Sequence, residues 1–271
     1  MEIKKYLQYL CALAIDPIRI IKFNHWKRNT TREYPEISIG KSLSKFEGCS
    51  KGKRCFIVGN GPSLRSEDLD LICQEDCFAA NGIWKIYEKT DWRATFYFIG
   101  DPKYASAIGD NIKNPISFAK ECFFVFTHIK NYPEILFSQS NVNFYYQPIH
   151  TIYKVLRDRI FGKGLPKFSE DITKDCFSCG TITYEMLQVA MYMGYEKIYL
   201  LGIDHTYLNG AHFSGCSETS NNQIVQNLKS WENGYLQAKV IAEKKGVSIF
   251  NATRGGQLEV FERMDFDKIQ F

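Results

Sequence analysis

The residues with the clearest capacity for chemistry follow an apolar run at residues 54–58. They are Gly59, Asn60, Gly61, Pro62 and Ser63. Small residues let the backbone approach a ligand closely, and a proline can open a helix whose free N–H groups bind phosphate. The spacing is not G-x-G-x-x-G, and no Lys follows as in a Walker loop. The segment therefore predicts a phosphate-binding loop, with a structural strand–turn–helix connection as the alternative.

A second group places a carboxylate beside imidazoles, after the apolar run at residues 197–201. Asp204 and His205 follow this run, and a glycine-containing turn then presents His212. A carboxylate and an imidazole in one loop can orient a hydroxyl group and remove its proton, because His titrates near neutral pH. We expect Asp204, His205 and His212 to be catalytic. The alternative is that Asp204 caps the turn and one His binds only backbone.

The third group is the segment 251–256, in which Arg254 precedes Gly255 and Gly256. A guanidinium group binds phosphate bidentately, and the glycines let the chain turn tightly. The alternative is a surface turn with a solvated Arg. Because loops after parallel strands meet at one edge of a sheet, the three small-residue loops are expected to converge on one binding site.

Metal-binding patterns are weak in this sequence. Asp68-Leu-Asp70 and Asp265-Phe-Asp267 have the D-x-D form of metal-dependent transferases, but the first lies in an expected helix, where residues i and i+2 do not share a face. Cys176 and Cys179 form a C-x-x-C with no second ligand pair at zinc spacing. Nine scattered cysteines in 271 residues indicate reduced thiols in a cytosolic protein. No metal site is expected.

Short apolar runs alternate with helical patterns from residue 51 onward. Strands are expected at 54–58, 78–80, 95–99, 123–126, 143–146, 197–201 and 247–250, and helices at 66–73, 181–193 and 223–245. This alternation predicts an α/β fold: a single Rossmann-like domain with a mostly parallel, doubly wound sheet and helices on both faces. The less regular stretch 104–175 is expected to be an inserted lid or, alternatively, a surface excursion.

The net charge of +4 is concentrated at the N-terminus. Residues 1–33 hold seven Lys and Arg against three acidic residues, which leaves 27 basic and 27 acidic residues in 34–271. A nucleic-acid-binding body would carry a basic excess, so nucleic acid is not an expected partner. We expect a basic amphipathic arm at 1–33, a polar linker at 34–50 and a catalytic domain at 51–271.

The arm contains two amphipathic pieces, at about 3–15 and 17–26. Its apolar run is shorter than the about 20 residues that a membrane-spanning helix needs. Cations and aromatic residues beside apolar ones suit a helix that lies in an anionic membrane interface, so residues 1–26 predict the membrane surface as a partner. The alternative is packing on the protein's own domain or on a partner subunit. A homo-oligomer stays open.

Three blocks of this sequence together resemble a known family: residues 59–64, residues 180–204 with the turn at 207–212, and residues 251–256. They resemble the 6-hydroxymethylpterin diphosphokinase-like domain family found in bacterial surface-polysaccharide proteins, over about residues 51–265. The first two blocks are also similar to the bacterial lipooligosaccharide sialyltransferases, which have a related Rossmann-like domain.

The resemblance to the sialyltransferases implies a CMP-linked sugar donor and no required cofactor. The expected nucleotide-binding residues, from this resemblance and from the loops above, are Gly59, Asn60, Gly61, Pro62, Ser63, Asn81, Asp101, Ser178, Gly180, Thr181, Tyr207, Arg254 and Gly255. Asp101 is Asn in that family, and Cys176 replaces a basic residue. The family's catalytic His lies in a later loop where this chain has none, so His212 or His205 must supply the base.

These observations predict a cytoplasmic glycosyltransferase, bound peripherally to the inner face of the cell membrane. It would transfer a sugar from a nucleotide donor to a glycan or lipid-linked acceptor in surface-polysaccharide biosynthesis. The diphosphokinase branch implies instead ATP, Mg²⁺ and diphosphate transfer to a pterin alcohol. A third hypothesis is a non-catalytic nucleotide-binding scaffold of a polysaccharide assembly complex, because the family's base and basic residue are missing.

Overall fold

The apolar runs of the sequence form the strands of one sheet. The computed structural model describes residues 2–35, 37, 39–148, 166–206 and 221–271. The strands are β1 (Arg54–Val58), β2 (Cys77–Ala80), β3 (Phe96–Ile99), β4 (Glu121–Val125), β5 (Val142–Tyr145), β6 (Lys197–Leu201), β7 (Ser248–Asn251) and β8 (Glu262–Arg263). Every neighbouring pair runs parallel. The expected α/β fold with a parallel sheet is confirmed.

The strand order is β5-β4-β3-β2-β1-β6-β7-β8. The chain thus builds the sheet outward from β1 to β5 and then returns to place β6 on the other side of β1. This is the doubly wound topology, and it puts a switch point between β1 and β6. In such sheets a crevice opens there, beyond the carboxyl ends of the strands.

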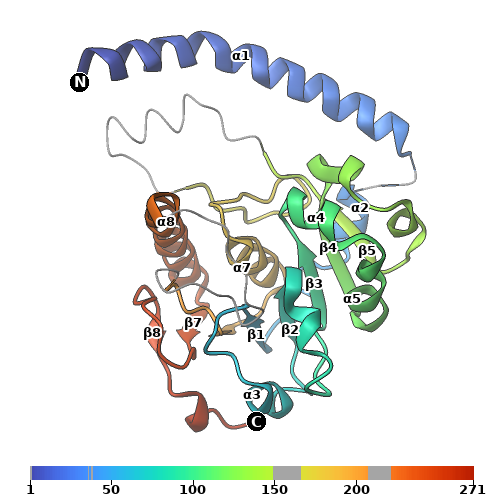
Figure 1. The fold of residues 1–271 in the computed structure, drawn as a ribbon, viewed down its shortest axis with the longest axis vertical. Coiled ribbons are helices and arrows are strands. Elements are labelled where there is room, and N and C mark those ends of the chain that lie inside the picture. The colour runs from blue at the N-terminus through green and yellow to red at the C-terminus, as the bar shows by residue number, and fades with distance from the viewer. Residues whose placement is uncertain (1, 36, 38, 149–165, 207–220) are drawn as a thin grey trace.

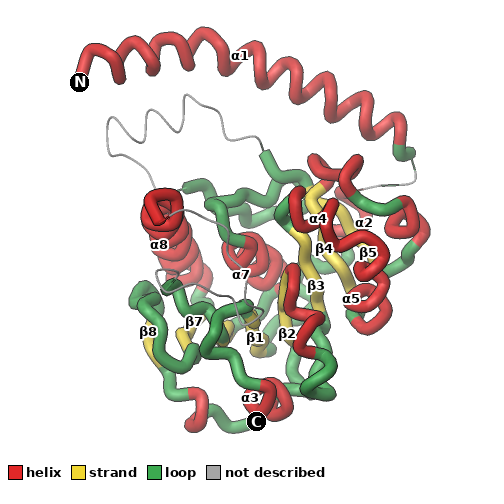
Figure 2. Tube along the Cα trace, in the orientation of Figure 1, coloured by secondary structure: helices red, strands yellow, loops and turns green. Residues whose placement is uncertain are grey.

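The sheet is flanked by helices, except that α1 runs along the outside of the body (Figure 1 and Figure 2). They are α1 (Glu2–Glu33), α2 (Ile39–Ser44), α3 (Ser66–Leu71), α4 (Pro102–Ile108), α5 (Lys113–Phe118), α7 (Ile182–Met193) and α8 (Asn221–Lys245). Short 3₁₀ helices lie at Asn81–Ile86, Gly109–Ile112, Phe126–Asn131, Glu134–Ser138 and Phe266–Lys268. Helix α7 packs against β1, β2 and β3 and against α8, which in turn packs on β7.

Aromatic side chains fill much of the core. Phe98 and Phe123 stack with ring centroids 4.7 Å apart, and Phe56 stacks on Tyr199 at 5.1 Å. Phe56, Phe98 and Phe123 are fully buried. Buried rings contribute large apolar areas and fixed geometry, so the edge of the sheet that carries the loops is rigidly held.

Two expectations for the N-terminal region are corrected. Helix α1 is one continuous helix rather than two pieces, although it contains Pro17. Proline removes one backbone donor, and the turns on either side maintain the helix. The stretch 34–50 is more than a linker, because α2 packs against β5 and buries Ile39 and Leu43, and Phe46 after it is also buried.

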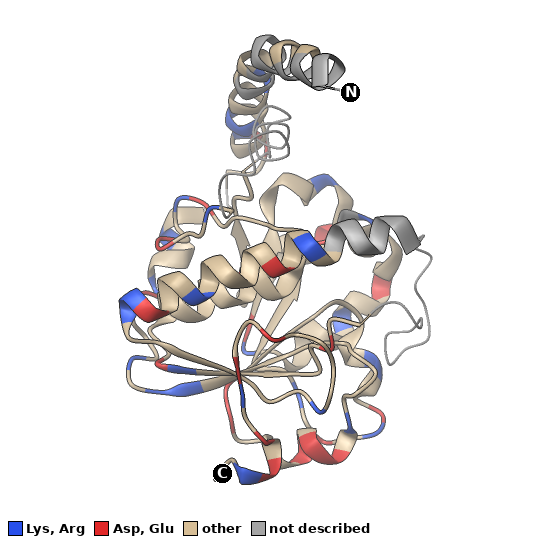
Figure 3. Cartoon of the chain, turned by 90° about the vertical axis from the view of Figure 1, so that its left-hand side faces the viewer, with Lys and Arg blue, Asp and Glu red and all other residues tan. Residues whose placement is uncertain are grey.

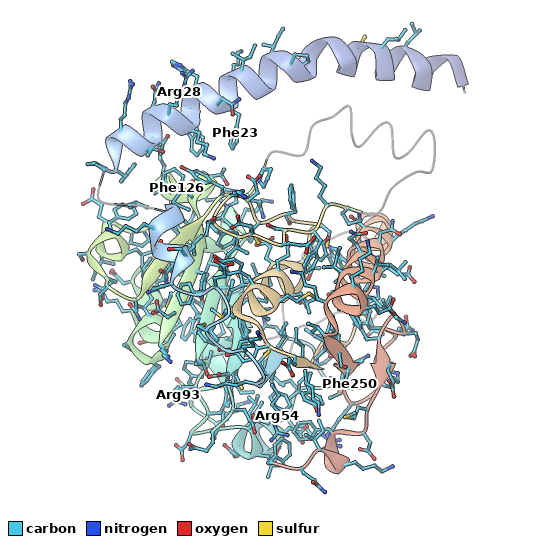
Figure 4. All side chains as sticks on the ribbon, turned by 180° about the vertical axis from the view of Figure 1, so that it is seen from behind. Phe23, Arg28, Arg54, Arg93, Phe126 and Phe250 are labelled. Carbon is cyan, nitrogen blue, oxygen red and sulfur yellow. The ribbon has the colours of Figure 1, made fainter. Side chains whose placement is uncertain are left out.

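The C-terminal half of α1 packs on the body of the protein. Trp26 lies 6.2 Å from Phe126, centroid to centroid, and the ammonium of Lys27 lies 3.4 Å from the ring centre of Tyr146. Figure 4 shows Phe23 on the side of the helix that faces the body and Arg28 on the outer side. Among the described residues, no helix is long and apolar enough to cross a membrane.

The stretch 104–175 is not a lid in its described part. It contains α4 and α5 and contributes β4 and β5 to the sheet, where buried aromatic residues hold both strands. Residues 149–165 lie outside the described residues. Strand β8 was not expected, because it has only two residues and its side chains are exposed.

Candidate active site

A cavity of about 590 Å³ opens at the carboxyl ends of the central strands. Its walls come from the loops after β1, β2, β3, β4, β5 and β6 and from α7 and α8. The lining residues are Val58, Gly59, Asn60, Gly61, Ala80, Asn81, Gly100, Asp101, His128, Gln147, Ser178, Gly180, Thr181, Ile182, Thr183, Glu185, Met186, Gly202, Ile203, His205, Trp231 and Tyr235. This volume is in the range of sites that bind small molecules and cofactors.

The loops after β1 and β6 touch at the switch point. The N–H of Gly61 donates to the carbonyl of Gly202 at 2.9 Å. A Cβ on Gly61 would lie 1.7 Å from Asp204 Oδ2, and one on Gly59 would lie 2.4 Å from the carbonyl oxygen of Gly202. Glycine is therefore required at both positions, and the close approach leaves the loop backbone at the cavity wall.

Asp204 holds these loops together rather than lining the cavity. Its Oδ2 accepts a hydrogen bond from the hydroxyl of Ser63 at 2.8 Å, and its carbonyl accepts from the N–H of Gln257 at 2.8 Å. Burial raises the pKa of Asp204, and the Ser63 hydrogen bond opposes that rise. This arrangement favours the alternative in which Asp204 stabilises the turn.

Two asparagines line the cavity at the ends of β1 and β2. The amide of Asn60 donates to the carbonyl of Ala80 at 3.1 Å. The side-chain oxygens of Asn60 and Asn81 are buried and have no hydrogen-bond partner among the described residues. An unsatisfied buried acceptor costs about 1–3 kcal/mol, so a ligand donor that reached either oxygen would offset that cost.

Glu185 is the most deeply buried acidic side chain of the cavity wall, with a relative exposure of 2%. The hydroxyl of Tyr145 donates to its Oε2 at 2.5 Å, and the amide of Gln147 donates to its Oε1 at 2.9 Å. Burial raises the pKa of Glu185 to about 7, while hydrogen bonds from Tyr145, Ser178 and Gln147 oppose the rise. The carboxyl group therefore changes charge near neutral pH.

Asp101 and His128 lie at the ends of β3 and β4. Asp101 Oδ1 accepts from the N–H of Lys103 at 2.8 Å and so caps α4. His128 Nδ1 is buried and lacks a hydrogen-bond partner among the described residues. Burial lowers the pKa of His128, and the charge of Asp101 opposes this, so the imidazole is neutral at neutral pH.

His205 closes the opposite side of the cavity against α8. Its ring meets those of Trp231 and Tyr235 at centroid distances of 6.2 and 5.9 Å. Burial lowers the pKa of His205, and the charge of Glu232 opposes that shift. Gly180, with a φ of +96°, lies so close to Trp231 that an added Cβ would be 2.9 Å from the indole nitrogen.

The cavity brings together nine of the residues expected from the sequence. They are Gly59, Asn60, Gly61, Asn81, Asp101, Ser178, Gly180, Thr181 and His205. Pro62, Ser63 and Asp204 lie next to this set without lining the cavity. Tyr207 and His212 lie outside the described residues, so their expected roles stay predictions.

Arg254 and Gly255 line a different cavity, of about 290 Å³. The guanidinium of Arg254 donates to both carboxylate oxygens of Asp68, at 2.8 and 2.9 Å, and also pairs with Asp267. Hydrogen bonds to these two acids raise the pKa of Arg254. The expected anion clamp is thereby corrected, because two acidic side chains already occupy the guanidinium group.

Glu185, His128 and Gln147 were not expected from the sequence. Glu185 could have been found as the one charged residue in the apolar run 182–193. His128 follows an expected strand, as Asp204 and His205 do. Gln147 carries no signal in the sequence, because polar residues after a strand are common.

A family model described as 6-hydroxymethylpterin diphosphokinase MptE-like matches residues 28–210, about two thirds of the chain. The chain belongs to this family. The expected resemblance is thus confirmed. No curated protein matches the MptE-like chain.

The MptE-like chain is also similar to solved structures. The MAf glycosyltransferase from Magnetospirillum magneticum AMB-1 has a TM-score of 0.47 and 13% identity, over 88% of this chain and 39% of that one. The sialyltransferase CstII from Campylobacter jejuni, in complex with CMP-3FNeuAc, has a TM-score of 0.44 and 15% identity, over 78% of this chain and 86% of that one. The sialyltransferase CST-II with a trisaccharide acceptor and CMP has a TM-score of 0.45, at 16% identity, over 78% and 85%. The MptE-like chain spans about two fifths of the MAf chain, and all three similarities concern the fold.

In the described part of the MptE-like chain, no group of three or more His, Cys, Asp or Glu side chains is placed to hold a metal ion. The two D-x-D segments instead supply Asp68 and Asp267 to Arg254. Cys176 and Cys179 are buried free thiols.

Proposed function

We propose that the protein is a glycosyltransferase that takes a sugar from a nucleotide donor. The observation that carries this proposal is the cavity at the switch point between β1 and β6. Its two halves have different chemistry, and together they suit the two parts of a nucleotide sugar.

One half suits the nucleotide. The loop backbone at Gly59, Gly61 and Gly202 borders the cavity without side chains, which lets a phosphate group come close. Trp231 and Tyr235 from α8 border the same side. Aromatic rings beside a polar loop are suited to a planar base or a ribose.

The other half suits a sugar. Asn81, Asp101, His128, Gln147 and Glu185 come from the loops after β2 to β5 and from α7, and they present both donors and acceptors. A sugar ring carries hydroxyl groups that donate and accept, so a mixed polar wall can fix its orientation. We therefore infer that the transferred sugar lies over β3 to β5, with the nucleotide over β1 and β6.

We propose CMP as the nucleotide of the donor, no required cofactor, and a glycan or lipid-linked acceptor of surface-polysaccharide biosynthesis. The test is the melting temperature of the protein with CMP, UDP, GDP and ATP, each with and without Mg²⁺. A rise with CMP or UDP that does not need Mg²⁺ supports the proposal. If no nucleotide changes the melting temperature, the transferase proposal is wrong. A rise without turnover of any sugar donor would support the scaffold instead.

The match to the MptE-like family favours a second candidate, transfer of diphosphate from ATP to a pterin alcohol. That reaction would use Mg²⁺. The described residues of the cavity include the carboxyl groups of Asp101 and Glu185, but they do not form a group of metal ligands. We derive no step through a metal ion. A rise in melting temperature with ATP that requires Mg²⁺ would support this candidate against the transferase.

We further propose that α1 holds the protein at an anionic membrane surface, on the cytoplasmic face. Its C-terminal half packs on the body, whereas several apolar side chains further toward its N-terminus are exposed: Leu7, Leu10, Ile18 and Ile21. Lys22 and Arg28 are exposed on the same helix. Figure 3 shows α1 projecting from a body on which acidic and basic residues are interspersed. Apolar side chains flanked by cations suit an interface of anionic lipids.

A further inference from the structure

Glu185 occupies an unusual place for an ionisable group. It lies in the first turn of α7, a helix that is otherwise uncharged and almost wholly buried. Its side chain nevertheless borders the cavity, on the side that we assign to the sugar. Burying a carboxyl group costs free energy, and an uncharged side chain at this position would avoid that cost. A carboxyl group at this position therefore points to a role that needs a proton acceptor.

The surrounding side chains fix the orientation of this carboxyl group. Tyr145 and Gln147, at the end of β5, each donate to a different oxygen of Glu185, at 2.5 and 2.9 Å. Gly100, at the end of β3, leaves room beside it, since an added Cβ would lie 3.1 Å from Glu185 Oε2. A carboxylate has about four lone-pair positions, so the three donors Tyr145, Ser178 and Gln147 leave it able to accept one further hydrogen bond from a substrate.

The tyrosine and cysteine side chains that interact with Glu185 stay uncharged around neutral pH. Tyr132, Tyr145, Cys176 and Cys179 interact with its charge, and burial raises the pKa of each of them. Burial lowers the pKa of His128, which lines the same half of the cavity. Burial raises the pKa of Glu185 to about 7, so its charge changes in this part of the site near neutral pH.

Three other acidic or basic groups of the site are already engaged. Asp204 accepts from Ser63 and does not line the cavity. Asp101 caps α4 through Oδ1. His205 packs against Trp231 on the side assigned to the nucleotide.

We infer that Glu185 is the general base of the reaction; this rests on the proposed glycosyltransferase function. The carboxylate of Glu185 takes the proton of the acceptor hydroxyl as that oxygen forms a bond to the anomeric carbon of the sugar. The bond from that carbon to the donor phosphate breaks, and its electron pair leaves with the nucleotide. Glu185 then releases the proton to solvent. Water can take the place of the acceptor hydroxyl, which gives hydrolysis of the donor.

The test is release of CMP or UDP from CMP- and UDP-linked sugars, with water or a methyl glycoside as acceptor, from about pH 5 to about pH 9. The variants are Glu185→Gln, Glu185→Asp and a matched control, Glu121→Gln. Glu121 is also a hydrogen-bonded carboxylate, held by Lys45 at 2.9 Å and Asn143 at 2.8 Å. It begins β4, at the edge of the sheet opposite the cavity.

For the wild type we expect kcat/KM to rise with pH and to level off above about 7, because the carboxylate is the active form. Glu185→Gln should lower kcat/KM by about 100-fold or more and abolish the rise, with an unchanged melting-temperature shift by CMP or UDP. Glu185→Asp should keep a pH-dependent rise at a lower rate, and Glu121→Gln should match the wild type. A rise that persists in Glu185→Gln, or a loss of less than about threefold, overturns the inference.

If Glu185→Gln does not fold, difference infrared spectroscopy of the wild type decides. We expect a protonated carboxyl band that disappears around pH 7. If no carboxyl group titrates there, the inference is overturned. A separate result tests the proposed function. If the wild type releases no nucleotide from any sugar donor, the glycosyltransferase function is overturned, and the role of Glu185 is overturned with it. Release that Glu185→Gln retains overturns only the role of Glu185.

Discussion

The buried carboxyl group of Glu185 should make the stability of the protein fall as the pH rises. Its pKa in the folded protein is about 7, against 4.5 for the free side chain. Between these values the folded protein keeps a proton that the unfolded chain has lost, so raising the pH favours unfolding. Each unit of pKa shift corresponds to about 1.4 kcal/mol, which gives a loss of about 3 kcal/mol from this group across the window.

Glu185→Gln removes this dependence, because glutamine does not titrate. The measurement is the free energy of unfolding in urea, for wild type and Glu185→Gln, at several values between about pH 5 and about pH 8. We expect the variant to gain about 3 kcal/mol relative to the wild type from the acid to the neutral end. Above about pH 7 the difference should stay constant, since both states have then lost the proton. A difference that changes by less than about 1 kcal/mol over the whole range would refute the reasoning.

Three further predictions concern the loops, Arg254 and the arm. Gly61→Ala should abolish the melting-temperature shift by nucleotides, because its Cβ would lie 1.7 Å from Asp204 Oδ2. The control Gly40→Ala should keep the shift, because its Cβ would meet nothing closer than 3.9 Å. Equal shifts in the two variants would contradict the proposed role of the loop. Arg254→Ala should lower the free energy of unfolding by about 3 kcal/mol, since it leaves the buried Asp68 unpaired. Nucleotide binding should stay intact. A folded variant that no longer binds nucleotide would support the hypothesis that Arg254 is an anion clamp. Serine substitutions in the exposed apolar part of α1 should reduce co-sedimentation with vesicles of anionic lipid without changing the melting temperature, and undiminished co-sedimentation would count against the membrane proposal. The positions to substitute are Leu7, Leu10, Ile18 and Ile21.

The strands and long helices of the body could be predicted because each is a local pattern. Every expected strand is present within two residues of its expected bounds, and the same holds for the helix at Ile182–Met193. Buried parallel strands are apolar on both faces, so short runs such as residues 54–58 identify them without tertiary information. The register Val58↔Leu201 then brings the loops after β1 and β6 together.

The site could be predicted only in part, because side-chain partners are not local. Arg254 meets Asp68, which is 186 residues away along the chain, and nothing in the segment 251–256 indicates that partner. Glu185 meets Tyr145 across 40 residues, and its burial depends on the whole layer around α7. A loop sequence indicates where a ligand can approach, whereas the charge state of the groups that meet it is set by the assembled fold.

The surface on which α1 packs includes Tyr146, which directly precedes the cavity residue Gln147 in the sequence. Tyr146 contacts Thr31 and Lys27 of α1, with a hydroxyl separation of 3.1 Å from Thr31, and the next residue, Gln147, holds Glu185. The arm is thus linked to the half of the cavity that contains Glu185 through its contacts with Tyr146, in addition to the chain that leads into α2. In a molecule bound to a surface through α1, the height of the cavity above that surface is therefore set by rigid protein. The length of an acceptor that is anchored in the same surface then decides whether its end can reach Glu185.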